Sequence, residues 1–123
     1  MAGRLKEQSL VPQIIVSSPA LRTKTTAEIF TDYLKLPESK LDKTIYEASQ
    51  KALLNVINKL PNEYDFIGLV GHNPGVAEIL YYLTGETREV HTTTVALIHF
   101  ETDDWGTISR DSGNLTYYSS PME

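Results

Sequence analysis

Two side chains that can carry positive charge stand where an apolar strand is expected to give way to a helix. His72 lies in a turn with Gly71 and Gly75, and glycine lets the main chain approach a ligand closely. Arg22 lies four residues after Ser18, where a second apolar strand is expected to end and a helix to begin. A guanidinium binds two phosphoryl oxygens at once, and an imidazolium adds another donor and charge. This pairing predicts a site for a phosphoryl group.

Each of the two residues also has a more ordinary interpretation. A loop histidine such as His72 can cap a helix or satisfy a backbone carbonyl, and Arg22 alone can be a solvated helix residue. Their shared position favours the functional interpretation, because ligands of α/β sheets bind beyond the carboxyl ends of the strands. The helix after each strand directs its unpaired N–H groups to the same space. We therefore expect Arg22 and His72 to face a single pocket.

Other candidates carry weaker signals. Glu47 could be a pocket carboxylate, although a surface or capping role is also open to it. Ser18 and Asn73 flank the two main candidates and are possible pocket residues, and either could instead cap a helix. His91 and His99 have no partner at a spacing that would bind a metal, so we expect structural or surface roles for them and no metal site.

The elements that must position these residues follow from the apolar pattern. Buried strands are expected at Ile14–Val16, Phe66–Val70 and Thr93–Phe100, because their apolar residues are continuous rather than alternating. Helices are expected after the first two strands, opened by Ser18–Pro19 and Asn73–Pro74, and between Ser49 and Pro61, with Gly85 ending the helix after His72. Short strands are expected at Lys43–Tyr46, Gly106–Ser109 and Leu115–Tyr118, and Met1–Gln8 is typical of the end of a helix. This alternation predicts a single α/β domain over residues 1–123 with helices on both faces of the sheet.

Composition narrows the classes of function. The 123 residues contain no cysteine, which excludes disulfides, cysteine-ligated metal sites and a cysteine nucleophile. Eleven basic against sixteen acidic residues give a net charge of −5, and no basic stripe is present that would bind nucleic acid. The N-terminus lacks the apolar stretch of a signal peptide, and no apolar run is long enough to span a membrane. We expect a cytoplasmic protein.

Two motifs carry a family resemblance. Val16–Glu28 (VSSPALRTKTTAE) resembles the second signature of the histidine phosphatase superfamily, which includes the phosphoglycerate mutases, and Leu69–Gly75 (LVGHNPG) resembles its later histidine signature. Tyr46–Ser49 and the closing Gly113–Pro121 are most similar to the SixA type of phosphohistidine phosphatase. The resemblance covers nearly the whole chain.

The resemblance implies a three-layer α/β/α fold with a mostly parallel sheet, as in phosphoglycerate mutase. It implies a hydrolase that transfers a phosphoryl group to a histidine and then hydrolyses the phosphohistidine. Arg22 and His72 would be the catalytic, phosphate-binding residues, with Glu47 as a possible assistant. By the same resemblance no metal or cofactor is required, and the partner is a phosphohistidine protein or a phosphorylated small molecule.

The sequence departs from the family at one point. The family begins with a strand that ends in Arg-His-Gly or Arg-His-Ala, whose histidine is the nucleophile, and no Arg-His pair occurs here. We expect the first strand and most of the first helix to lie outside this sequence, and the chain as given to be inactive. Two alternatives remain open: a non-catalytic phosphate- or phosphoprotein-binding module, and a remnant that folds poorly or borrows the missing strand from another chain.

Overall fold

The computed structural model describes residues 11–119, except for 47, 89 and 91–94. The parallel sheet of this region has the strand order β2-β1-β3, and a second sheet pairs two strands antiparallel. The strands run over Ile14–Ser17 (β1), Lys40–Leu41 (β2), Ile67–Val70 (β3), Val95–Phe100 (β4) and Gly113–Ser119 (β5). The structure therefore confirms the mixed α/β class with a mostly parallel sheet.

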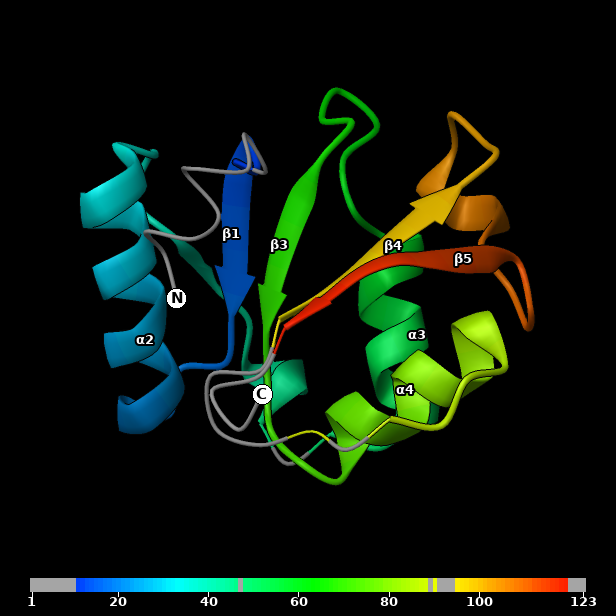
Figure 1. Ribbon diagram of the computed structural model, residues 1–123. Coiled ribbons are helices and arrows are strands. Elements are labelled where there is room, and N and C mark those ends of the chain that lie inside the picture. The colour runs from blue at the N-terminus through cyan, green and yellow to red at the C-terminus, as the bar shows by residue number, and fades with distance from the viewer. Residues whose placement is uncertain (1–10, 47, 89, 91–94, 120–123) are drawn as a thin grey trace.

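The three parallel strands end at the same edge of the sheet. Ser17 at the end of β1 is in register with Val70 at the end of β3 and with Leu41 at the end of β2. The N–H of Asp42 then donates to the carbonyl of Ser17 at 2.8 Å. The carboxyl ends of all three strands lie toward the bottom of Figure 1, where the loops to the next elements begin.

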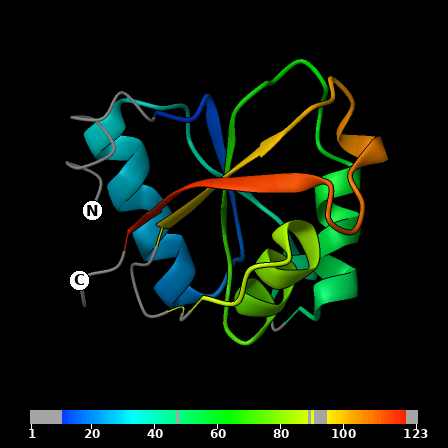
Figure 2. The same cartoon turned by 45° about the vertical axis from the view of Figure 1, so that its right-hand side comes forward.

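Helices cover the strands on both sides. They are α2 (Leu21–Leu34), α3 (Gln50–Asn58) and α4 (Gly75–Thr84), and short 3-10 turns occupy Lys43–Ile45 and Trp105–Thr107. In Figure 2 the strands lie between α2 on one side and α3 and α4 on the other. This arrangement is the layered one that the alternation of strands and helices predicts.

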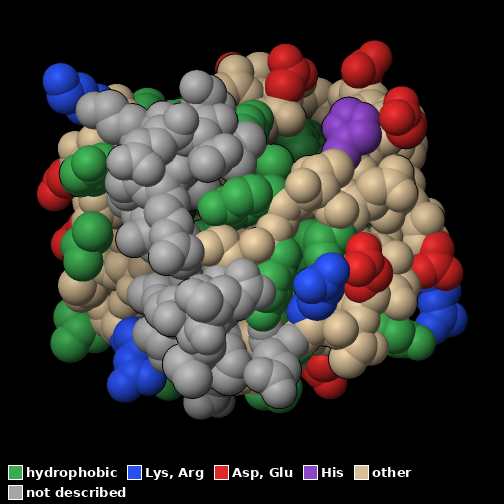
Figure 3. Space-filling model, in the orientation of Figure 1, with side chains coloured by type: hydrophobic (Ala, Val, Ile, Leu, Met, Phe, Trp, Pro, Cys, Tyr) green, Lys and Arg blue, Asp and Glu red, His purple; other side chains and the backbone are tan. Residues whose placement is uncertain are grey.

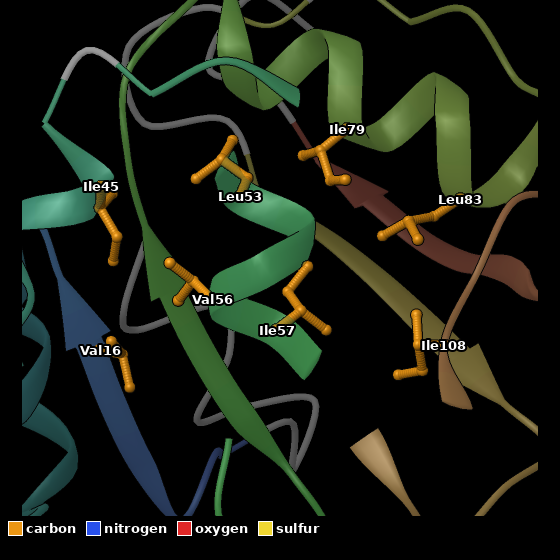
Figure 4. Packing of buried hydrophobic residues seen from close by; sticks show 8 residues of the cluster. All are labelled: Val16, Ile45, Leu53, Val56, Ile57, Ile79, Leu83 and Ile108. Carbon is orange, nitrogen blue, oxygen red and sulfur yellow. The ribbon is translucent and has the colours of Figure 1, made fainter. Parts of the chain in front are cut away.

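The hydrophobic core lies where α3 and α4 meet the strands (Figure 4). Leu53 of α3 and Ile45 of the preceding turn are each 1% exposed. Complete burial of one such side chain contributes roughly 1.5–3 kcal/mol. The buried members of this cluster are Val16, Ile45, Leu53, Val56, Ile57, Ile79, Leu83 and Ile108.

One edge of β3 has no strand hydrogen-bonded to it among the described residues. The carbonyls of Phe66 and Val70 accept hydrogen bonds from the β1 side, from Gln13 and Ser18. Because backbone groups alternate along a strand, the N–H and C=O of Ile67 and Leu69 point to the opposite edge.

Strand β4 shares this property, since within the described residues it pairs only with β5. Figures 1 and 2 both place β4 as the strand next to β3. All four residues of β3 remain half-buried, although its apolar run predicts burial on both faces. Figure 3 shows hydrophobic side chains at the surface in the region where Figure 1 places β3 and β4. As far as the described residues go, the sheet is therefore open between these two strands.

Some local predictions are wrong. Lys43–Tyr46 is not a strand, because Asp42 Oδ1 accepts from the Thr44 N–H at 2.9 Å and winds the segment into a turn. In the same way Asp104 Oδ1 accepts from Gly106 and replaces the strand predicted at Gly106–Ser109. Strand β4 is not buried throughout, since Ala96 and His99 are exposed. Met1–Gln8 lies outside the described residues.

Two of the predicted helix ends are observed, and two are not. Ser49 caps α3 by accepting from the Ala52 N–H, and Gly85 ends α4 with a φ of 75°. These two features confirm the predictions. Helix α2, however, begins with Ala20 as its N-cap and α4 with Pro74, and neither start has a side-chain cap. Ser18 and Asn73 therefore do not cap these helices, and their side chains are available for other bonds.

Gly75 is required for packing. A Cβ atom there would clash with the backbone carbonyl oxygen of Ala48. We expect Gly75→Ala to lower the free energy of unfolding by about 1–3 kcal/mol, because relief of the clash requires backbone movement. Denaturant titration measures this change. Gly106→Ala is the control, since its Cβ would meet the Asp104 side chain at 3.1 Å, and Asp104 is exposed. An equal loss in the two variants would contradict this account.

Candidate functional site

The loop after β1 is held by buried hydroxyl groups. Ser17 and Ser18 are both 0% exposed. The Ser17 hydroxyl donates to the carbonyl of Ser18 at 2.9 Å, and the Thr23 hydroxyl shares its hydrogen between the same carbonyl and that of Ala20, each at 3.0 Å. The N–H of Ser18 donates to the carbonyl of Val70 at 3.1 Å and ties the loop to β3. Ser18 therefore has a fixed position at the carboxyl edge of the sheet.

His72 lies two residues beyond β3, directly beside this loop. Its Nε2 is 2.8 Å from Ser18 Oγ, although the two residues are 54 positions apart in the sequence. The carbonyl of His72 accepts from the Val76 N–H at 2.9 Å, which links the turn to the first residues of α4. The two motifs that stood out in the sequence are thus joined by this side-chain hydrogen bond as well as by the backbone bond from Ser18 to Val70.

Tyr46 is a residue of this site that the sequence did not single out for function. Its ring lies edge-on to the His72 ring, with centroids 5.6 Å apart and an interplanar angle of 81°. Tyr46 follows the turn after β2, which runs parallel to β1 and ends at the same edge of the sheet. The strand predicted at Lys43–Tyr46 hid this relation, because it placed Tyr46 inside a strand instead of after one.

Arg22 is the second residue of α2, and it is exposed. Its guanidinium forms no hydrogen bond or ion pair with any described residue. It therefore stands at the same edge of the sheet as His72 with its donors open to a ligand. That Arg22 and His72 bind one phosphate stays a prediction.

A hollow of about 430 Å³ lies beside His72. Arg22 is not part of its lining, whereas the carboxylate residue Glu78 is, so this hollow does not unite the two predicted phosphate ligands. Its lining is formed by Ala48, Ser49, His72, Asn73, Pro74 and Glu78. The amide of Asn73 is engaged elsewhere, because its Nδ2 donates to the carbonyl of Val90 at 2.6 Å.

The remaining candidates lie apart or outside the described part of the chain. Glu47 and His91 are outside the described residues. His99 is on the surface, where its Nε2 is 3.3 Å from Glu101 Oε1. Among the residues that the structure describes, no three His, Asp or Glu side chains form a group that could hold a metal ion.

On the face seen in Figure 3, the coloured Lys and Arg side chains are scattered and do not gather into a patch. None of the helices in the described part of the chain combines the length and the apolarity that crossing a bilayer requires.

The anchoring of Ser18 by Thr23 can be tested. Thr23→Val removes a buried hydroxyl of nearly constant shape and should cost about 1 kcal/mol of stability. We also expect it to shift the NMR signals of the His72 ring, because Ser18 contacts that ring. Thr31→Val is the matched control, since Thr31 is also buried in α2 and its hydroxyl donates only to the carbonyl of Glu28 at 3.0 Å. Unchanged His72 signals in Thr23→Val would refute the anchoring.

Comparison with known proteins identifies the fold. No protein-family model matches the sequence, and no curated protein matches it either. Three solved structures match over almost the whole chain. The protein histidine phosphatase SixA complexed with tungstate has 23% identity and a TM-score of 0.81, over 98% of this chain and 76% of that chain. A structure named as phosphohistidine phosphatase SixA from Agrobacterium tumefaciens has 20% identity and a TM-score of 0.80, over 98% and 75%.

A third structure, named as phosphohistidine phosphatase SixA from Nakamurella multipartitia, has 16% identity and a TM-score of 0.80, over 99% of this chain and 78% of that chain. The chain has the fold of the SixA-type phosphohistidine phosphatases, as its resemblance to the histidine phosphatase superfamily predicted.

Proposed function

We propose that this chain forms the larger part of a metal-independent phosphatase for phosphohistidine or phosphomonoesters, whose nucleophilic histidine lies on a segment outside this sequence. The observation that carries the proposal is the 2.8 Å contact between His72 Nε2 and Ser18 Oγ. This contact brings the two phosphatase-like motifs together at the carboxyl edge of a parallel sheet. Arg22, with no partner among the described residues, stands at the same edge.

The residues at this edge have the chemistry that phosphoryl transfer needs. The Arg22 guanidinium would bind two non-bridging oxygens, and the His72 ring would donate to another. As the bond to the leaving group breaks, these donors stabilise the charge on the phosphoryl oxygens. One of the solved relatives is complexed with tungstate, an oxyanion of the kind that such donors bind.

The reaction would proceed in two transfers. The histidine of the outside segment attacks phosphorus while the bond from phosphorus to the substrate nitrogen or oxygen breaks, and the leaving group departs and takes up a proton. Water then attacks phosphorus, the bond to the enzyme histidine breaks, and inorganic phosphate is released with the histidine regenerated. A phosphoramidate leaving group needs little help from a strong acid, so no dedicated acid is required. Glu47 is the carboxylate that would assist proton transfer.

The open edge of β3 supports an outside segment that enters the sheet. Ile67 and Leu69 direct backbone donors and acceptors to that edge, and unpaired backbone groups within a sheet are costly. A strand that lies there parallel to β3 would end at the same edge as His72. Its final residues would then reach the phosphoryl group held by Arg22 and His72. The SixA structures leave room for such a segment, since this chain covers 75–78% of their length.

A second function, phosphate or phosphoprotein binding without turnover, is favoured by one observation. The sequence contains the two phosphate-binding candidates but no Arg-His pair that could supply the nucleophile. In this alternative the same donors at the sheet edge hold a phosphoryl group and no bond is broken.

The chain as given should bind phosphate, vanadate or sulfate weakly and hydrolyse nothing. Charge-assisted hydrogen bonds contribute roughly 1.5–3 kcal/mol each, before the cost of ordering the ligand. NMR titration with inorganic phosphate should show binding that is lost in Arg22→Ala and in His72→Ala. Arg110→Ala, which removes the same charge from another exposed position, should bind like the parent chain. Hydrolysis of para-nitrophenyl phosphate that disappears in His72→Ala would instead make His72 a nucleophile.

Addition of an N-terminal segment whose first strand ends in Arg-His-Gly or Arg-His-Ala should create phosphatase activity. The strand would pair the open edge of β3 and hold the histidine nitrogen in line with phosphorus, so that positioning replaces a chance encounter. Hydrolysis of a phosphohistidine protein and of small phosphate esters measures the activity, and replacement of the new histidine by alanine is the control.

In the extended protein, Arg22→Ala should lower kcat more than it raises KM, because transition-state charge is what Arg22 stabilises. Arg22→Lys should restore only part of the activity, since an ammonium cannot make the two-pronged contact. If the extended protein is folded but inactive on both substrate classes, the phosphatase proposal fails and the binding module takes its place.

A further inference from the structure

We propose that Ser18 fixes the tautomer of His72: the Ser18 hydroxyl donates to Nε2, the ring proton is held on Nδ1, and the Nδ1–H is the donor that His72 offers to a phosphoryl oxygen. The donor role of Nδ1–H toward a phosphoryl oxygen rests on the proposed function, whereas the assignment of the tautomer does not. Ser18 is in this sense a positioning residue, which acts through His72 and does not touch the ligand.

The direction of the Ser18–His72 bond follows from the partners of the Ser18 hydroxyl. A hydroxyl group has one hydrogen to donate and two lone pairs that accept. One lone pair accepts from the Ala20 N–H, at 3.3 Å. The hydroxyls of Ser17 and Thr23 donate to the Ser18 carbonyl and not to its Oγ. Among the described residues, His72 Nε2 is therefore the one acceptor within reach of the Ser18 hydrogen.

Burial makes the opposite direction costly. If Nε2 carried the proton and donated to Ser18 Oγ, the Ser18 hydrogen would have no acceptor in the described part of the chain. Water cannot take its place, since Ser18 is 0% exposed. A buried donor without an acceptor costs about 1–3 kcal/mol. The neutral ring with its proton on Nδ1 avoids this cost, because Nε2 then accepts the Ser18 hydrogen.

Nδ1 is the ring nitrogen that remains for a ligand. Within the described residues the ring of His72 has one hydrogen bond, which uses Nε2. Tyr46 packs against the ring at 81° and restricts its rotation. His72 itself is half-exposed, so solvent or an anion can reach the ring. A neutral Nδ1–H gives the site a directed donor without the need for a positive charge on His72.

The tautomer is measured directly on the chain as it exists. Long-range ¹H–¹⁵N correlation NMR at alkaline pH, where the ring is neutral, distinguishes a protonated from an unprotonated ring nitrogen. We expect the His72 pattern, assigned by its loss in His72→Ala, to show a protonated Nδ1 and an unprotonated Nε2. A protonated Nε2 would overturn the proposal. This result requires no variant of Ser18 to fold.

Paired serine variants then test the cause. Ser18→Ala should release His72 to a mixture of tautomers, and Ser18→Thr, if folded, should keep the parent pattern because it keeps the hydroxyl. Ser17→Ala is the matched control for the tautomer: Ser17 is equally buried, and its hydroxyl donates to the Ser18 carbonyl rather than to His72. Its loss can shift the ring signals through the loop, but the proton should stay on Nδ1. A parent-like tautomer in folded Ser18→Ala would show that Ser18 does not set it.

The ligand half is tested with inorganic phosphate. Its addition should move the ¹⁵N signal of His72 Nδ1 and leave Nε2 in place, and Ser18→Ala should weaken phosphate binding by about tenfold, the loss of one well-aligned hydrogen bond. If the tautomer is as proposed but phosphate does not move Nδ1, the donor role is wrong while the positioning role stands. Inactivity of the extended protein would remove the phosphatase and leave both of these measurements intact.

Discussion

The register between β1 and β3 is the constraint on which the site depends. Ile14 pairs with Ile67 and Ser17 with Val70, so the two strands end level with each other. A slip of one residue would move Ser18 by about 3.3 Å relative to His72 and would turn alternate apolar side chains to the wrong face. Ile14, Ile15 and Val16 are all buried, and this burial holds the register. The hydrogen bond at the sheet edge is therefore a product of packing in the core.

Buried hydroxyl groups convert that packing into a defined site. Ser17, Ser18 and Thr23 are all less than 6% exposed, and each has its hydrogen-bonding partners. Within the described residues no buried side-chain nitrogen or oxygen lacks a partner. Because a satisfied polar network resists rearrangement, the loop after β1 has one conformation in which Ser18 can meet His72. Arg22, one turn further on, depends on the same loop for its place.

The sequence predicted much of this arrangement from simple rules. Continuous apolar runs located β1 and β3, and the rule that ligands bind at the carboxyl ends of parallel strands brought attention to Ser18, Arg22 and His72. Contacts between segments that are distant in the sequence could not be predicted from it. Asn73 bonds to Val90, 17 residues away, instead of capping α4.

Tyr46 reaches His72 because Asp42 replaces a predicted strand with a turn. Two acceptor bonds of one aspartate, to the N–H and the hydroxyl of Thr44, thus overrode the apolar pattern. The packing role of Gly75 was also missed from the sequence. Its missing side chain makes room for the carbonyl of Ala48, a neighbour that only the packing of α4 against the start of α3 brings close. Neither contact leaves a local signature in the sequence.

The open edge between β3 and β4 has a consequence for how the chain folds. If a strand from outside this sequence closes it, as the proposed function requires, that strand pairs with Ile67–Val70 on one side and with Val95–Phe100 on the other, and neither partner is close to it in sequence. Such non-local pairing raises contact order and slows folding. Until it is complete, the exposed edges can pair with those of other chains, in a process whose rate grows with protein concentration. Closure of the sheet within one chain is intramolecular, whereas edge-to-edge pairing between chains is bimolecular. Dilution therefore favours closure over association.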